Sequence, residues 1–546
     1  MGRAHYSCAL RFLLLASWLL QPARAAVKCF EEFDFVCQEL LHPNSRCIDG
    51  FCSSPFQEGC LKAYGIIDQK RICNSHDPPE DVGVLCEPTS DILDYNELRI
   101  LGQDWDSSMF TAWVMQIVLS ELVRVPVSIE SSGPNGNLSF YHPGLSFDYG
   151  VASYDYDAMR RGKDLVDCRL TDEPCAHVLP EVWNGQNDNM RRYEDEGLIE
   201  NAVAGGGVAK YSWFMPRVLA ETEHSLLSHF GLRGEEARRK LASIFNRPTT
   251  WKDYCEIVST NNCTIPDNTT ARAPLTQEEN EAYYINGLYT GHFRPTEDND
   301  CDANPTTCTG HMTNVICSWS TFVVPQAYYA GIHVKSNGPT PSGGYPFKAM
   351  VEIWRAANAT KSPVLYYWFQ PDPLLQEFLG TDFEFQEILL PFPTQECASS
   401  RVSEEERCSD EFQIQLGVEE GSCDSESHSY QKLIVGNLWE ETYSTPPAER
   451  SPAYDAIKNF RISDLQLNDM FTYWNARKTD KWGYDPHEAV CRWVVENVDD
   501  LRRFVPRSYP RTVEASDGYH TPLLYSAIAV GLLAGIVVVI TGIGVF

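Results

Sequence analysis

The stretch LRILGQDWDSSMFTAWVMQIVL, from Leu98 to Leu119, changes its hydrophobic period in the middle. Leu98, Ile100 and Leu101 are typical of a short buried strand, and apolar residues recur from Phe110 to Val118 at helical spacing. The polar residues 102–108 between the two predict a turn. The stretch therefore predicts strand, turn and helix, the repeating unit of an α/β fold.

The turn is a good place for a ligand. Asp106 or Ser107 can cap the helix, so that its free N–H groups and the positive end of its dipole face the turn. In open α/β sheets small molecules bind at such a strand end. Trp105 lies in the turn itself, and its ring either offers a stacking surface to a ligand or folds back under its own helix. A binding cleft is our first hypothesis for this position.

Composition places the chain among folded, acidic proteins. It has 546 residues, of which 43% are hydrophobic and 22% charged, enough for two to four domains. The formal net charge of −31 disfavours nucleic acid and anionic lipid as partners. It favours small cationic or zwitterionic partners, although solubility alone also accounts for such a charge.

The first 25 residues are typical of a secretory signal peptide, with a basic start, an apolar run from Phe12 to Leu20 and a small-x-small site at 23–25. Cleavage there removes Cys8 from the 19 cysteines and leaves an even number, which favours disulfides in an oxidising compartment. Four acceptor sequons fit passage through a eukaryotic secretory pathway, at Asn137, Asn262, Asn268 and Asn358.

The last 24 residues, 523–546, carry no charge and are long enough to cross a bilayer. They predict either a single-pass anchor or the removed tail of a lipid-anchor signal with its site at Ser516, Asp517 and Gly518. The spacer between 518 and 523 is short for a lipid-anchor signal, which favours the single-pass anchor. We expect a protein of the cell surface or of a secretory-pathway membrane, with the bulk of the chain extracellular or lumenal.

Cysteines are dense near the N-terminus. Seven of them lie between Cys29 and Cys86 among few apolar residues, which predicts a small disulfide-rich module over residues 26–90. The spacing lacks a Cys-x-x-Cys pair and disfavours zinc. The seventh, Cys86, is expected to pair outside the module or to mark its boundary. Further along, short-loop disulfides are expected at two places, Cys301 with Cys308 and Cys255 with Cys263.

Tryptophan recurs at the ends of the other expected strands. The segment 177–185 is expected to be a strand that ends on Glu181 and Trp183, and another strand runs from Val208 into Trp213. The three glycines 205–207 just before it predict a turn or a crossover between lobes. Further strand ends and turns place tryptophan at Trp319, within 318–320, and at Trp368, in the break after a strand at 364–367.

Several of these segments resemble one family. SPVLYYWFQPDP followed by LLPFPTQEC, and the late helix DPHEAVCRWVVENVDDLRRFVP, are similar to segments of the glycine-betaine-type substrate-binding proteins of ABC transporters. GQDWDSS, EVWNG and YSWFMP also occur in the order of that family. The resemblance is spread over residues 91–510 in short pieces. The Cys-rich preface, the inserts at 246–309 and 396–429 and the apolar tail depart from the family.

The resemblance implies a two-lobed α/β fold of the type II periplasmic-binding-protein kind in a membrane-anchored form. Lobe one would take residues 91–201 and 396–510, lobe two residues 202–395, and a linker at 511–522 would lead to the tail. The implied function is capture of a small solute between the lobes, for uptake or sensing, with an unidentified transporter or receptor subunit as partner.

The resemblance also implies an aromatic cage. A quaternary ammonium group has no N–H to donate, and the negative faces of aromatic rings attract it. Trp105, Trp183 and Trp368 are expected to form most of the cage, with Trp213 and Trp319 as further members. The expected polar contacts are Asp104, Ser107, Ser108 and Glu181. Core packing is the alternative for each ring. The expected ligand is a quaternary amine, a betaine or an amino acid, with no cofactor and no metal.

Two rival functions stay open. The chain lacks the Gly-x-Ser-x-Gly, His-Glu-x-x-His and phosphate-loop motifs, which disfavours the commonest enzyme classes. A secreted hydrolase with an acid pair such as Asp155 and Asp157 is the alternative from the enzyme class. The other alternative is an adhesion or receptor ectodomain that keeps the fold without a ligand.

Overall fold

A computed structural model describes a little over half of the chain. The described residues are 46–48, 51–53, 58–75, 77, 86–88, 95–103, 105–131, 156–165, 167–183, 195, 199–248, 284–285, 288–289, 293–340, 342–436, 438, 451–476 and 486–507. Within these ranges no helix is both long and apolar enough to span a bilayer. The predicted signal peptide, linker and apolar tail lie outside them, as do the sequons at 137, 262 and 268.

The predicted strand, turn and helix are confirmed as β3 (Leu98–Gly102) and α4 (Asp106–Ile117). Every residue of β3 and of α4 is buried, the polar ones included, so both elements are covered on all sides by other parts of the chain. The predicted side-chain cap is wrong, because Trp105 is the N-cap residue and makes no side-chain cap hydrogen bond. The hydroxyl of Ser107 donates to a buried carboxylate instead.

A seven-stranded sheet organises the fold, in the order β13-β6-β15-β5-β3-β4, with β14 also paired to β6. β3 is parallel to β4 and β5, whereas β15 is antiparallel to both β5 and β6. The mixed sheet with its surrounding helices confirms the α/β class. The strands of this sheet are β3, β4 (Val127–Ser131), β5 (Val178–Val182), β6 (Ile199–Pro216), β13 (Tyr366–Gln370), β14 (Phe385–Ile388) and β15 (His428–Val435).

The remaining described strands form two-stranded pairs. They are β1 (Arg46–Ile48) with β2 (Phe51–Ser53), β7 (Arg247–Pro248) with β10 (Phe293–Arg294), β8 (Tyr284–Ile285) with β9 (Leu288–Tyr289), and β11 (Gly310–His311) with β12 (Val334–Lys335).

Helices pack around the sheet. The α-helices besides α4 are α3 (Cys60–Ala63), α5 (Tyr156–Leu165), α7 (Arg217–Thr222), α8 (His229–Leu232), α9 (Glu235–Ile244), α12 (Val323–Tyr329), α13 (Phe347–Thr360), α14 (Pro373–Phe378), α15 (Gln395–Ser399), α16 (Glu404–Arg407), α17 (Phe412–Leu416), α19 (Ala453–Asn459), α20 (Asp464–Ala476), α21 (Pro486–Glu496) and α22 (Val498–Leu501). One π-helix is described, η2 (Val118–Val123). The described 3₁₀-helices are η3 (Cys168–Leu170), η4 (His224–Leu227), η5 (Glu297–Asn299), η6 (Glu419–Gly421) and η7 (Arg502–Phe504).

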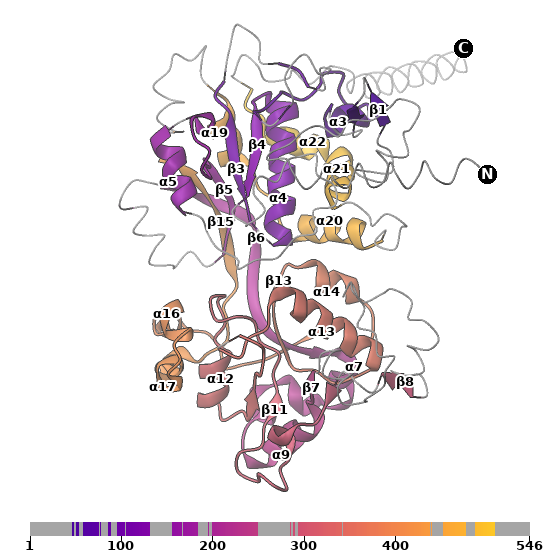
Figure 1. Cartoon of the computed structure of the whole chain (residues 1–546), viewed down its shortest axis with the longest axis vertical. Coiled ribbons are helices and arrows are strands. Elements are labelled where there is room, and N and C mark those ends of the chain that lie inside the picture. The colour runs from indigo at the N-terminus through magenta and orange to yellow at the C-terminus, as the bar shows by residue number, and fades with distance from the viewer. Residues whose placement is uncertain are drawn as a thin grey trace, which may run out of the picture.

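Figure 1 shows two bodies, one above the other, which we call the upper and the lower body. The upper body holds β3, β4, β5, α4, α5 and α19 to α22, and the lower body holds β7, β11, α7, α9, α12 to α14, α16 and α17. β6 passes from one to the other: its first half pairs with β15, and its second half pairs with β13 and β14. The bodies also touch directly, since Asn475 of α20 donates to the carbonyl of Pro373 of α14 at 3.0 Å.

The three glycines 205–207 lie inside β6, so the predicted turn is wrong, whereas the alternative, a crossover between lobes, agrees with the passage of β6 from one body to the other. The ring of Tyr430 on β15 lies directly against them. A Cβ atom on Gly205 would lie 2.6 Å, and one on Gly207 2.3 Å, from atoms of that ring. Gly206 has a φ of 108°, a conformation that side-chain-bearing residues rarely adopt. Glycine is therefore needed here because a tyrosine ring approaches the strand backbone closely.

The sequence prediction assigned residues 396–429 to lobe one. The disulfide between Cys317 and Cys408 ties this segment to the residues before α12 instead, and a second disulfide joins Cys397 to Cys423 within the segment. Figure 1 shows α16 and α17 beside α12 in the lower body.

The N-terminal cysteines do not all pair within one small module. Cys60 is bonded to Cys491 of α21, and Cys86 is bonded to Cys73. The expectation that Cys86 pairs outside the module is therefore wrong, and Cys60 makes the outside pair. The region around α3 is consequently part of the upper body. The predicted short-loop disulfide between Cys301 and Cys308 is confirmed, and Cys255 and Cys263 lie outside the described residues.

Candidate functional site

A pocket opens where three tryptophans from separate segments meet, with about 540 Å³ of empty space when the adjoining solvent is included. Trp105 stands between β3 and α4, Trp183 directly follows β5, and Trp319 lies between β11 and α12. The first two belong to the upper body and the third to the lower. The lining residues are Trp105, Trp183, Tyr211, Ser318, Trp319, Ser320 and Phe369.

One carboxylate oxygen holds two of the three tryptophans. Oε1 of Glu181, which is 0% exposed, accepts the indole N–H of Trp105 at 2.8 Å and the hydroxyl of Ser107 at 2.5 Å. It also accepts the indole N–H of Trp183. The nitrogen edges of both rings are therefore tied to the same atom, and the ring positions around the pocket are coupled through Glu181.

Burial raises the pKa of the Glu181 carboxyl, and hydrogen bonds from Ser107, Trp105 and Trp183 oppose that rise. All three donate to Oε1, so they stabilise the ionised form. Burial is the largest cause, so the net effect disfavours the ionised form of Glu181, and the attraction for a cation comes from the aromatic faces themselves. Among the described residues that line the pocket, none is basic. The electrostatics of the pocket therefore favour a positively charged group.

Phe369 and Tyr211 complete the aromatic wall. They lie opposite each other in the register of β13 and β6. The ring of Phe369 meets Trp183 edge-on at a centroid distance of 5.4 Å and Trp319 at 5.8 Å, and Tyr211 lies 5.5 Å from Trp183. Burial raises the pKa of Tyr211 to about 12, so its phenol remains a hydrogen-bond donor at neutral pH.

The structure places the other predicted site residues away from this lining. Trp213 is 0% exposed and donates its indole N–H to Gln326 at 2.8 Å. Trp368 is also 0% exposed, with its ring centroid 5.2 Å from that of Phe347. Both rings belong to the hydrophobic core. For these two tryptophans the structure shows the core packing that the sequence left as the alternative.

The physical reason lies in the position of β13. The sequence predicted a strand at 364–367 with Trp368 in the following break, but β13 runs from Tyr366 to Gln370. Trp368 is thus inside the strand, opposite Ser212, while the next residue, Phe369, reaches the pocket. The aromatic run itself was visible in the sequence, but no local signal showed which of its rings lines the pocket.

The predicted polar contacts have different roles. Ser107 and Glu181 are bonded to each other behind the rings, and the hydroxyl of Ser108 donates to Oε1 of Gln103 at 2.7 Å. Ser108 is not part of the lining. Asp104 lies outside the described residues. The polar side chains in the lining are Ser318 and Ser320, which the sequence predicted only as a turn.

The rival acid pair lies elsewhere. Asp157 is exposed on α5, where its carboxylate lies 3.5 Å from Nη1 of Arg160 in the next turn. Asp155 lies outside the described residues. Among the described residues, the lining of the aromatic pocket contains no carboxylate. Its geometry therefore offers no acid pair to a bound substrate.

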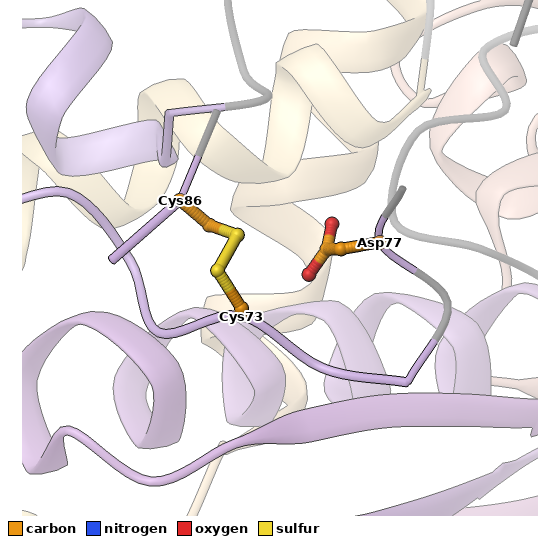
Figure 2. Close-up of side chains that lie close together, drawn as sticks. All are labelled: Cys73, Asp77 and Cys86. Carbon is orange, nitrogen blue, oxygen red and sulfur yellow. A yellow bond between two sulfur atoms is a disulfide. The ribbon is translucent and has the colours of Figure 1, made fainter. Parts of the chain in front are cut away.

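One group of metal-ligand side chains occurs in the part of the chain that the structure describes, formed by Cys73, Asp77 and Cys86. Figure 2 shows that the two sulfur atoms are joined in a disulfide. The Asp77 carboxylate already accepts from Nη1 of Arg71 at 2.8 Å and from the backbone N–H of Asn74 at 2.7 Å. Thiolates are the form of cysteine that binds metals, so this group is structural.

No family model matches the chain, and no curated protein matches it. Solved structures with some likeness include lactococcal OpuAC in its closed form with glycine betaine, at 8% identity and a TM-score of 0.36, covering 75% of this chain and 100% of that one. An unliganded, semi-closed choline-binding protein of an ABC transporter has 9% identity and a TM-score of 0.37, covering 78% of this chain and 98% of that one.

The glycine betaine/L-proline-binding protein ProX from Borrelia burgdorferi has 10% identity and a TM-score of 0.35, covering 76% of this chain and 97% of that one. At such identities and TM-scores these likenesses assign neither a ligand nor a site to this chain. The function has to be argued from the pocket itself.

Proposed function

We propose that the protein captures a small solute with a quaternary ammonium group, cationic or zwitterionic, in the aromatic pocket. The observation that carries the proposal is the set of three tryptophans from both bodies around one hollow, two of them bonded to the buried Glu181 carboxylate. A quaternary ammonium group offers no N–H, and each ring face attracts it by about 0.5–2 kcal/mol. Betaines and choline are the solute classes that fit this chemistry.

The arrangement of the two bodies supports capture by closure. Trp105 and Trp183 come from the upper body, whereas Trp319 comes from the lower. β6 and β15 connect the two, so a bend in these strands would change the distance between the rings. Hinge closure around a ligand is a common motion of two-lobed proteins. In this proposal the two bodies close over the solute and exclude water from the aromatic rings.

The setting of this activity is also part of the proposal. We infer from the sequence that the chain is exported, glycosylated and tethered by residues 523–546, with the pocket on the extracellular or lumenal side. Of the four sequons, only Asn358 lies in the described residues, half-buried on α13. A transporter or receptor subunit would receive the solute or the signal.

Calorimetric titration of the full-length chain in detergent tests the proposal, with choline and glycine betaine as ligands. The neutral carbon isostere of choline, 3,3-dimethylbutan-1-ol, is the matched control ligand, because it has the same shape without the charge. We expect one of the two ammonium compounds to bind and the isostere to bind at least 10-fold more weakly, a difference of about 1.4 kcal/mol.

The matched variants are Trp319→Ala in the lining and Phe230→Ala on the surface, where Phe230 is 65% exposed. The first should weaken binding of the ammonium compound at least 10-fold, and the second should leave it unchanged. Equal binding of choline and its isostere, or full binding by the Trp319 variant, contradicts the proposal.

A further inference from the structure

Two half-buried arginines of the lower body, Arg401 and Arg407, form no ion pair among the described residues. The guanidinium carbons of Arg401 and Arg407 lie 4.7 and 5.3 Å from the ring centroid of Phe322, which is 4% exposed. Arg407 donates to the carbonyls of Cys317 and Val402, both at 3.1 Å. Within the described ranges neither arginine has a carboxylate oxygen at ion-pair distance. This is unexpected in a chain with a net charge of −31.

The nearest acids are engaged elsewhere or exposed. Glu406 acts on Arg407 from the same helix, but its carboxylate accepts the backbone N–H of Ser403 at 2.6 Å. Glu404 is exposed on that helix. Burial lowers the pKa of Arg407, which shows that its charge is poorly solvated. Glu404 acts on Arg407 more strongly than Glu406 does, but both acids are exposed, so the half-buried guanidinium is left open to an external anion.

A small cavity lies beside the Arg407 guanidinium, with about 310 Å³ of empty space when the adjoining solvent is included. Its polar lining besides Arg407 is neutral and consists of Asn314, Thr321, Ser342 and Gln415. The Thr321 hydroxyl donates to Oδ1 of Asn314 at 2.7 Å, which leaves the Asn314 NH₂ group without an acceptor in the described part of the chain. The cavity therefore offers a positive charge and amide and hydroxyl donors, and no carboxylate.

We propose that this cavity, the Arg407 cavity, binds a small monovalent anion of the size of chloride. The guanidinium supplies the charge, and the neutral polar side chains supply further donors. The site is distinct from the aromatic pocket, although both are lined by one segment: Cys317 and Thr321 face the cavity, and 318–320 face the pocket. The bound anion therefore lies beside Cys317 and Thr321, which flank the segment 318–320 that carries Trp319.

Thermal unfolding of the full-length chain in detergent tests the site. Sodium chloride is compared with sodium gluconate at the same ionic strength, so that the cation and the ionic strength stay constant and only the anion changes. We expect chloride to raise the melting temperature in a saturable way, since a ligand that binds only the folded state stabilises it. The Arg407→Gln variant should lose this chloride-dependent rise.

The matched control is Arg233→Gln. Arg233 is exposed and lies over the Phe230 ring at 4.9 Å, so it also contacts an aromatic ring but lines neither hollow. It should keep the full chloride-dependent rise. Equal melting temperatures of the wild type in the two salts, or the same chloride-dependent rise in the Arg407 variant, overturn the proposal.

A second measurement needs no variant, because Arg407→Gln also removes hydrogen bonds to two carbonyls and can impair folding. Crystals of the wild-type protein grown in bromide should show an anomalous peak at hydrogen-bond distance from the Arg407 guanidinium. No peak in the cavity overturns the proposal. A peak without a chloride-dependent melting temperature means an adventitious ion only and overturns it too. Neither measurement uses an organic solute, so the outcome is independent of the proposed solute-binding function.

Discussion

Nε1 of Trp105 lies 2.8 Å from Oε1 of Glu181, which joins the first residue before α4 to the end of β5. The two residues are far apart in sequence, and their contact is possible because β3 and β5 are parallel neighbours in the sheet. The carboxyl ends of parallel neighbours meet at one edge, where the Trp105 and Trp183 rings converge on the same acid.

Replacing Glu181 by glutamine should loosen both rings. The amide keeps one acceptor oxygen but puts an NH₂ donor in place of the second carboxyl oxygen at a fully buried position, which perturbs the acceptor shared by the two indole N–H groups. We expect a shift in tryptophan emission and an affinity for choline lower by about 10-fold, or about 1.4 kcal/mol. Fluorescence and calorimetry on the full-length chain measure both effects. Glu221→Gln, at an exposed position of α7, is the control, and an unchanged Glu181 variant would refute the positioning role.

The two groups of tryptophans should respond differently to truncation. Trp368→Ala removes a fully enclosed ring and should lower the free energy of unfolding by about 3–5 kcal/mol. Trp319 is only half-buried, so its substitution by alanine should cost clearly less stability while weakening solute binding. Urea unfolding of both variants makes the comparison. Equal losses of stability would mean that Trp319 is a core residue too.

Stability should fall as pH rises from about 4.5 to about 7 because of Glu121. Burial raises the pKa of its carboxyl from 4.5 to about 7, although the backbone N–H groups of Leu61 and Cys60 donate to it at 2.7 Å. In this window the folded chain holds a proton that the unfolded chain has released, so the protonated folded state is favoured at the lower pH. The shift corresponds to about 3 kcal/mol.

Denaturant unfolding of wild type and Glu121→Gln at pH 5 and pH 7.5 measures this effect. The variant is neutral at both values, so its stability should change less with pH than that of the wild type. Glu236→Gln, at an exposed position of α9, should keep the pH dependence of the wild type. If the wild type and the Glu121 variant show the same pH dependence, Glu121 does not titrate in this window.

Removal of the bond between Cys60 and Cys491 should cost more than removal of the bond between Cys301 and Cys308. The first closes a loop with a sequence separation of 431, the second one of 7. In the chain-entropy model a disulfide restricts the unfolded state more when its loop is longer, with typical effects of about 2–5 kcal/mol. Double serine variants of each pair, compared by thermal unfolding, give the two losses. A larger loss for the short loop would contradict the entropic explanation.

Local patterns predicted much of the fold. The change of period between residues 98 and 119 identified β3 and α4, because burial imposes a period of about 2 on strands and 3.6 on helices. The segment 177–185 likewise contains β5 with Trp183 at its end. Such signals are properties of neighbouring residues, so a single sequence contains them.

These local patterns could not predict which distant parts of the chain come into contact. The glycines 205–207 read as a turn because nothing nearby in the sequence shows that the Tyr430 ring lies against them. The partner of Cys60 is 431 residues away, and cysteine spacing contains no information at that distance. Burial of Arg401 and Arg407 beside Phe322 likewise depends on how the lower body packs.

The sequence by itself determined the class of fold and the chemistry available to the site: an α/β chain with indole rings at strand ends and an acid beside one of them. Only the tertiary structure decided which rings share a hollow. The registers of β13 and β6 put Phe369 and Tyr211 in the pocket and leave Trp368 and Trp213 in the core. The physical reason is that neighbouring rings in an aromatic run look alike in sequence, and only strand pairing settles which of them reaches the pocket.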